Sequence, residues 1–123
     1  MLDRKARQTT ADQTATLTEV GPGQFALQGS LSLSSIPALA RQGGRMLKAM
    51  RAEHPREPVV VVIDLSGVNR SSSAGVALLL DWVEQAVRDG ISLRFQHWPE
   101  AMVRIATFSN VEDLLGIEAA QHG

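Results

Sequence analysis

The sequence predicts a single α/β domain in which helices pack on a mixed β-sheet. An unbroken run of β-branched residues at 59–63 is typical of a strand that is covered on both faces. Segments with strand-like alternation and helix-like spacing follow one another in the order β-β-α-β-α-β-α, which favours a central sheet with helices packed on it. The chain has 123 residues, 44% of them hydrophobic, so it is long enough for one well-buried core and too short for two.

The N-terminal part of the chain predicts a tail followed by a β-hairpin. Residues 1–12 are charged and small, without an apolar period, and we expect a flexible N-terminal tail there. Residues 14–20 and 24–30 alternate apolar and polar side chains, and the Gly-Pro-Gly sequence between them is a strong turn signal. With a short C-terminal tail at 118–123, the folded domain is expected to span residues 13–117.

Hydroxyl side chains and a proline mark the start of the first helix. Ser34 and Ser35 are suited to an N-cap, and Pro37 is favoured in the first turn of a helix. Apolar residues then recur at helical spacing until about Glu53, and the glycine pair at 43–44 is the weak point of this helix. The apolar residues are Leu39, Met46, Leu47 and Met50.

Strands and helices alternate in the second half of the chain. The predicted elements are a strand at 59–63, a helix at 76–89, a strand at 91–97, a helix from Pro99 through Phe108 and a short turn or helix at 111–115. Gly90 ends the first of these helices, and Pro99 opens the next one. Between the strand at 59–63 and the helix at 76–89 lies the serine-rich segment DLSGVNRSSSAG at 64–75.

The helix at 76–89 is expected to bury one stripe of side chains against the sheet. At about 100° per residue, Leu78 lies nearly opposite the main apolar stripe and Trp82 falls to one side of it, so we expect both on the surface. They are four residues apart and therefore neighbours, and a large aromatic side chain is a favoured anchor of protein interfaces. The predicted core stripe is Val76, Leu79, Leu80, Val83 and Val87. The predicted partner-binding side chains are Leu78, Asp81, Trp82 and Gln85.

Three consecutive serines precede this helix. A helix N-terminus exposes unpaired amide groups, which a hydroxyl caps well and which favour the binding of a phosphate. Capping explains one hydroxyl, whereas a run of three leaves at least one free for solvent or for a partner. Simple capping and a contact surface formed by Ser71, Ser72, Ser73 and Ala74 are both open at this point.

A serine hydrolase is a further interpretation of the same residues. Ser73, Asp64 and a histidine supply the residue types of a catalytic triad, and the histidines available are His54, His97 and His122. However, the nucleophile-elbow spacing G-x-S-x-G is absent, and no glycine precedes the serine at the turn. The pattern therefore predicts no catalytic residues. Scattered histidines in a chain without cysteine also predict no metal site and no cofactor.

Composition excludes several classes of function. The formal net charge is -1 and the pI is near 6.3, so no global positive field favours nucleic acid. The absence of cysteine removes disulfides and cysteine nucleophiles. The N-terminus lacks the apolar core of a signal peptide, and no run approaches the ~18 apolar residues of a membrane span. We therefore expect a cytoplasmic protein without a membrane-spanning segment.

Cations gather on the first helix and at its exit. They are Arg41, Arg45, Lys48, Arg51 and Arg56. A solvated helix face is the expected interpretation. The alternative is attraction to anionic lipid headgroups or to an acidic partner surface.

The serine-rich segment and its neighbours resemble the STAS domain family, whose founding members are anti-sigma factor antagonists. The family motif is a buried strand ending in D-L-S-x-V, then a D-S-x-G or D-T-x-G loop, then an apolar helix. Residues 64–68, DLSGV, match the first part, and the helix sequence GVALLLDWVEQAVRDG matches the last. Ser73-Ala74-Gly75 falls on S-x-G, which puts Ser73 at the phosphorylatable hydroxyl and Ser72 where the family usually has aspartate. The resemblance spans residues 14–117.

This resemblance implies a non-enzymatic binding protein with a STAS fold. Within the family, the helix and the later segment AMVRIATFSNVEDLLG are most similar to the small STAS subunits of bacterial phospholipid ABC transporters. The implied partner is the ATPase subunit of such a transporter, in a complex that includes a membrane permease and maintains outer-membrane lipid asymmetry. The implied alternative is an anti-sigma factor antagonist that is switched by phosphorylation of Ser73. With this resemblance, a contact surface at the serines is favoured over simple capping.

Overall fold

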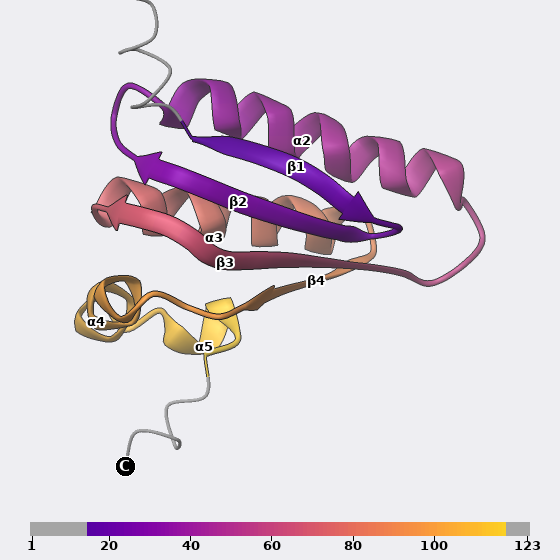
Figure 1. The fold of residues 1–123 in the computed structure, drawn as a ribbon. Helices are drawn as coiled ribbons and strands as arrows, with labels where there is room; N and C mark the ends of the chain where they lie inside the picture. Colours follow the sequence, from indigo (N-terminus) through magenta and orange to yellow (C-terminus); the bar gives the residue numbers. More distant parts are fainter. Residues whose placement is uncertain (1–14, 118–123) are drawn as a thin grey trace, which may run out of the picture.

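The computed structural model describes residues 15–117, which form one four-stranded sheet with helices packed against it (Figure 1). The strands are β1 (Thr16–Gly21), β2 (Gln24–Leu31), β3 (Val59–Ser71) and β4 (Ile91–Gln96). Their order in the sheet is β1-β2-β3-β4, with an antiparallel β1–β2 pair and parallel β2–β3 and β3–β4 pairs. The predicted mixed sheet and the predicted hairpin are therefore confirmed. The predicted tails at 1–12 and 118–123 lie outside the described residues.

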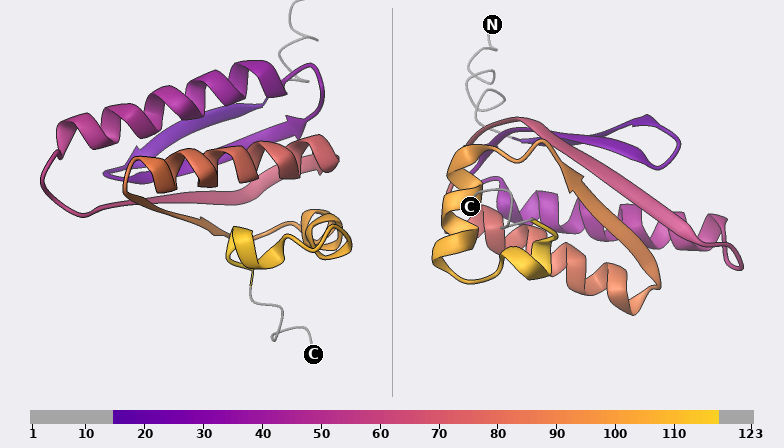
Figure 2. Two further views of the ribbon diagram at one scale, coloured as in Figure 1. Left: turned by 180° about the vertical axis from the view of Figure 1, so that it is seen from behind. Right: turned by 90° about the horizontal axis from the view of Figure 1, so that it is seen from below.

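The helices are α2 (Ile36–Glu53), α3 (Ser73–Arg88), α4 (Glu100–Phe108) and α5 (Glu112–Leu115). The two long helices, α2 and α3, lie side by side on the same face of the sheet (Figure 2). Helix α3 also contacts α4 and α5, so it is the central helix of the domain. The predicted element order is confirmed, with α5 as the short final helix. Within residues 15–117, no helix combines the length and the apolar character that crossing a membrane requires.

Strand β3 is covered on one face only, so the prediction of a strand buried on both faces is wrong. Val59, Val61 and Ile63 are buried and point toward the helices, whereas Val60 is 48% exposed and Val62 is half-buried. Helices α2 and α3 both cover the same side, and none of the described helices lies on the other (Figure 2). The β-branched run therefore reflects the backbone preference of a central strand as much as its burial.

Strand β3 is also longer than the apolar run predicted, because it continues through most of the serine-rich segment to Ser71. Leu65 and Val68 are buried and extend the inward-facing side of the strand. The register against β2 shifts between Ala26 and Gln28 and again between Gly29 and Ser30, each time with an extra residue in β3. Such irregularities bend a strand. Strand β3 then ends at Ser71, and one residue later α3 begins at Ser73.

Candidate partner-binding site

Ser72 is the only residue between β3 and α3, and it caps the helix. Its backbone is extended, with φ −120° and ψ −176°, and its hydroxyl accepts a hydrogen bond from the Ala74 N–H at 3.2 Å. This bond satisfies one of the amide groups that a helix N-terminus leaves unpaired. The capping that the sequence pattern requires is therefore supplied by the middle serine of the three.

The other two serines differ from each other. The Ser71 hydroxyl donates to the Ser72 carbonyl oxygen at 3.1 Å, so it is engaged with the local backbone. Ser73 is the first residue of α3 and is exposed, and its hydroxyl has no hydrogen-bond partner among residues 15–117. Ser73 thus presents a free hydroxyl at the N-terminus of α3, where the helix dipole favours negative charge.

Gly75 lets the start of α3 approach the end of β2. A Cβ atom at this position would lie 2.4 Å from the Ser71 Oγ and 3.0 Å from the Leu31 Cβ, both closer than ordinary van der Waals contact. Leu31 belongs to the core and is 1% exposed, so it has little room to move. Gly75 therefore fixes how the serines sit against the sheet.

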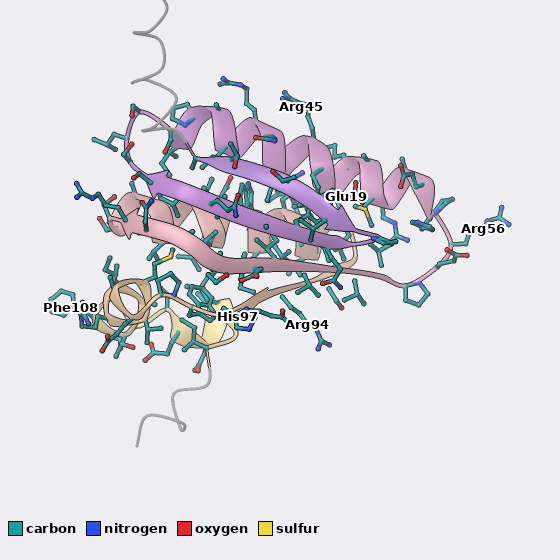
Figure 3. All side chains as sticks on the ribbon, viewed as in Figure 1. Glu19, Arg45, Arg56, Arg94, His97 and Phe108 are labelled. Atoms are coloured by element: carbon teal, nitrogen blue, oxygen red, sulfur yellow. The ribbon has the colours of Figure 1, made fainter. Side chains whose placement is uncertain are left out.

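A groove of about 960 Å³ separates Ser73 from helix α4. Its other lining residues are Ala101, Val103, Arg104, Ile105, Thr107, Phe108 and Ser109. Phe108 is 92% exposed, the highest value for any large hydrophobic residue within 15–117. Figure 3 shows its side chain pointing away from the ribbon beside α4. The groove is therefore mainly apolar and is open to solvent next to the free Ser73 hydroxyl.

The loop between β2 and α2 lies at the same end of the sheet as the serines. Strands β2 and β3 are parallel, and Leu31 pairs with Ser71. Both strands therefore end at the same end of the sheet, and each leads into a helix there (Figure 1). The Ser30 hydroxyl donates to the Asn69 Oδ1 at 3.0 Å and ties the two strand ends together. Leu33, in the β2–α2 loop, is 80% exposed.

A polar hollow adjoins this loop and is lined by Ser30, Ser32, Asn69 and Arg70. We call the surface formed by residues 30–34, 69–74 and 101–109 the serine end. It combines hydroxyl groups, two arginines and two exposed apolar side chains, and the N-termini of α2 and α3 both open toward it (Figure 1). The sequence predicted only its central part, Ser71 to Ala74.

Leu78 and Trp82 do not lie on the surface, so their predicted exposure is wrong. Leu78 is 4% and Trp82 is 1% exposed, and both belong to the core. The reason is Gly43 in α2, where a Cβ atom would lie 2.2 Å from the Trp82 ring. The indole fills the space that this glycine leaves, so the weak point expected in the first helix is instead a site of close helix packing.

The buried stripe of α3 is consequently rotated toward α2. Val76 and Leu79 are buried as predicted, but Val87 is 72% exposed, and Leu80 and Val83 are only partly buried. The prediction assumed that the helix packs on the sheet alone, whereas α3 packs on both the sheet and α2. A helix with two neighbours buries a wider and differently centred stripe than a helix with one.

Of the remaining predicted contact residues, Gln85 is engaged within the chain and Asp81 is exposed. The Gln85 side-chain amide donates to the Gly44 carbonyl oxygen at 3.1 Å, which links α3 to α2. Asp81 lies on the outer side of α3. The structure therefore leaves Ser72, Ser73 and Asp81 exposed, with Ser71 and Ala74 partly so.

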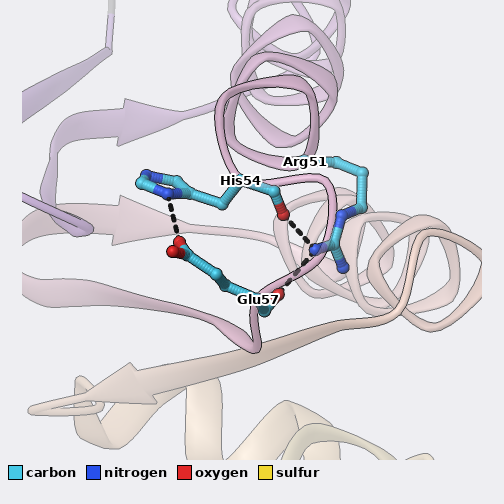
Figure 4. A network of polar contacts seen from close by, with 3 residues as sticks. All are labelled: Arg51, His54 and Glu57. Carbon is cyan, nitrogen blue, oxygen red and sulfur yellow. Dashed lines mark hydrogen bonds and ion pairs between the residues drawn. The ribbon is translucent and has the colours of Figure 1, made fainter.

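The cations of the first helix do not form one free surface. The Arg51 guanidinium donates to the carbonyl oxygens of His54 and Glu57, the latter at 2.6 Å, and His54 Nδ1 lies 2.8 Å from a Glu57 carboxylate oxygen (Figure 4). Arg51 also donates to the carbonyl oxygens of Asp89 and Gly90, each at 3.3 Å. Arg51 is thus a clamp that joins the end of α2 to the turn after α3.

Asp64 and His97 are brought together, although Ser73 is not part of their cluster. The His97 Nδ1 lies 3.0 Å from the Asp64 Oδ1, which also accepts a hydrogen bond from the Ser66 N–H at 2.8 Å. The Ser66 N–H, followed by His97, lowers the pKa of the Asp64 carboxyl below its ordinary value. Among the described residues, no group of three or more His, Asp or Glu side chains is arranged to hold a metal ion.

Two features of the sequence indicate what was not predicted, namely the exposure of Phe108 and the packing of Trp82 on Gly43. Met102 and Ala106 are four residues apart and so share one face of a helix, which places Phe108 on the other side. The glycine pair at 43–44 in a long helix signals close approach of a neighbouring element, here the Trp82 ring. Neither signal identifies its neighbour, because Gly43 is far from Trp82 in the sequence, and Ser73 is far from Phe108, with which it lines one groove.

The family model that describes the MlaB STAS domain matches residues 15–116. The chain belongs to this family. The match covers the whole described domain except its last residue, and it includes the serine end. STAS domains generally mediate protein–protein interaction and are typically regulatory or accessory modules rather than enzymes.

Solved structures support the STAS fold. The unphosphorylated form of the anti-sigma factor antagonist SpoIIAA superposes with a TM-score of 0.61 at 10% sequence identity, over 81% of this chain and 84% of SpoIIAA. SLC26A9 matches with a TM-score of 0.58 at 10% identity, over 73% of this chain and 16% of that much longer one. A comparison with curated protein sequences gave no match. At these identities the likeness concerns the fold.

Proposed function

We propose that this STAS domain is an accessory subunit of a bacterial phospholipid ABC transporter and that it binds the cytoplasmic ATPase of that complex, an MlaF-like subunit. The observation that carries the proposal is the match of the MlaB-type family model over residues 15–116. In this role the chain acts without cofactor or catalysis, on the cytoplasmic side of the inner membrane and next to the membrane permease. Transport by the complex would maintain the lipid asymmetry of the outer membrane.

The serine end is the contact surface in this proposal. The Ser73 hydroxyl has no hydrogen-bond partner within residues 15–117, and the groove beside it is mainly apolar and open. An apolar groove with a few polar groups at its edge is the kind of surface that a protein partner buries. Trp82 and Gln85 contribute indirectly, because they hold α3 against α2 and so set the position of its N-terminus, and Leu78 contributes as part of the buried core.

Adding a negative charge at Ser73 tests the contact. The variant Ser73→Asp should lose ATPase binding, because a carboxylate without a partner in a closed interface must be desolvated without compensation. Ser73→Ala should retain most of the binding, and both variants should remain folded, since a helix N-terminus tolerates a carboxylate. The matched control is Ser92→Asp, which adds the same charge at an exposed serine on β4. Full binding by Ser73→Asp in a pull-down with the purified ATPase would contradict this contact.

The second candidate function is an anti-sigma factor antagonist that a kinase switches at Ser73. The observation that favours it is the free hydroxyl at a helix N-terminus, where a phosphate is electrostatically stabilised. Ser72 stands where the family usually has aspartate, which favours the constitutive subunit instead. Intact mass spectrometry of the protein from its native host separates the two. A substantial phosphorylated fraction, together with recovery of a kinase-like partner in place of an ABC ATPase, would support the switch.

A further inference from the structure

The groove at the serine end is bordered by an aromatic residue, Phe108, that nothing within residues 15–117 covers. Phe108 is 92% exposed, and Leu33, across the serine end, is 80% exposed. Exposed apolar residues scattered singly are common, but here they border a groove that is already lined by Ala101, Val103 and Ile105. Within residues 15–117 no side chain buries them, so this end of the domain offers an apolar surface to a partner segment.

The serine end carries two arginines, and the residue adjacent to it, Glu100, is acidic. Within residues 30–34, 69–74 and 101–109, the charged side chains are Arg70 and Arg104, and none is acidic. The N-termini of α2 and α3 add partial positive charge at the same end (Figure 1). Glu100 lies 3.5 Å from Arg104 and offsets part of its charge, so Arg70 and the two helix N-termini are the main positive groups at this end. The surface is therefore complementary to a segment that carries carboxylates.

A second groove on α3 serves as an internal comparison. It is lined by Leu80, Val83, Glu84, Val87, Arg88 and Leu114. It also exposes large apolar side chains, with Val87 at 72% and Leu114 at 64%. Its charged residues have both signs, and Arg88 lies 3.8 Å from Glu84 on the same helix. It lies at the C-terminal part of α3, away from Ser73, and lacks a positive helix end.

We propose that the serine end binds an apolar segment of the ATPase that carries carboxylates, with its apolar side chains in the groove under Phe108 and its carboxylates toward Arg70, Arg104 and the start of α3. This inference rests on the proposed function and specifies the chemistry of the partner segment. The complementarity also gives a reason why a negative charge at Ser73 disrupts the contact. A carboxylate or phosphate there repels the acidic segment in addition to its own desolvation.

Matched variants test the two parts of the segment separately. Affinity for the purified ATPase is measured by calorimetry at low and high salt. Phe108→Ala should weaken binding by about tenfold or more, as truncation of an interface anchor does, whereas Val87→Ala should leave it within about twofold. Arg104→Glu should weaken binding at low salt and reduce its salt dependence, whereas Arg88→Glu should not. The two arginines are well matched, because each pairs with a glutamate four residues earlier.

Photocrosslinking identifies the occupant of the groove. The photoreactive residue p-benzoylphenylalanine replaces Phe108 in one sample and Val87 in the other, and crosslinked peptides are read by mass spectrometry. An ATPase peptide rich in apolar residues and containing Asp or Glu, captured only from position 108, supports the proposal. A peptide from a second copy of this chain, a basic ATPase segment, or capture from position 87 alone would overturn it.

Different binding results would contradict the proposed function and the assignment of the groove. If the wild-type chain does not bind the ATPase, the proposed function is wrong and this assignment falls with it. If the wild-type chain binds, but Phe108→Ala and Arg104→Glu bind equally well, the proposed function stands and the assignment of the groove is overturned. Circular dichroism of each variant shows whether the fold is intact.

Discussion

Trp82 and Phe108 are both aromatic residues on helices, yet they occupy opposite environments. Trp82 is 1% exposed and fills the contact between α2 and α3, whereas Phe108 is 92% exposed at the serine end. Gly43 leaves room for the indole ring, while no described residue covers the phenyl ring. The residue type and its place on a helix therefore do not by themselves tell whether the ring is buried. The neighbouring element decides, as α2 does for Trp82.

Removing the indole should have the largest effect on stability. Trp82→Ala deletes a buried aromatic ring and leaves a cavity between α2 and α3, which typically lowers the free energy of unfolding by about 3–5 kcal/mol. Chemical denaturation of the purified domain measures the change. A loss below about 1 kcal/mol would mean that the ring is not packed as described.

Filling the space that receives the indole should have the next largest effect. Gly43→Ala places a Cβ atom against the Trp82 ring, and overpacking of this kind typically costs about 1–3 kcal/mol. Gly44→Ala is the matched control, because its Cβ atom would meet the end of the flexible Gln85 side chain at 3.3 Å and alanine is the better helix former. Equal melting temperatures for the two variants would argue against close packing at Gly43.

Removing either hydroxyl at the start of α3 should have a smaller effect on stability, and the two effects should differ. Ser72→Ala removes the cap and should lower the free energy of unfolding by about 1 kcal/mol. Ser73→Ala removes a hydroxyl that caps nothing and should change it by less than about 0.5 kcal/mol. Thermal unfolding followed by circular dichroism measures both. The reverse order would assign the cap to Ser73.

Removing the exposed ring should have the smallest effect on the isolated domain. Phe108→Ala should change the free energy of unfolding by less than about 0.5 kcal/mol, because the side chain has little contact to lose. Denaturation beside Trp82→Ala gives the comparison directly. A loss as large as that of the tryptophan variant would show that Phe108 packs within the chain, and it would remove the reason for assigning it to a partner.

Only the central part of the serine end, Ser71 to Ala74, was predicted from sequence, because its chemistry is local. Three hydroxyls before a helix exceed what capping requires, and the structure engages Ser71 and Ser72 while leaving Ser73 without an internal partner. The groove beside Ser73 was not predicted. It forms between residues about 30 positions apart, and no local pattern states that α4 returns to the start of α3.

The sequence by itself determined the order of the elements and the mixed sheet. Alternation, helical spacing and turn residues such as Gly23, Gly90 and Pro99 are local signals, and short connections limit how the elements can be arranged. Only the tertiary structure decided which side chains are buried. Helical spacing defines a stripe, but the centre of that stripe depends on how many elements pack against the helix. Helix α3 meets both the sheet and α2, so Leu78 and Trp82 moved into the core and Val87 moved to the surface.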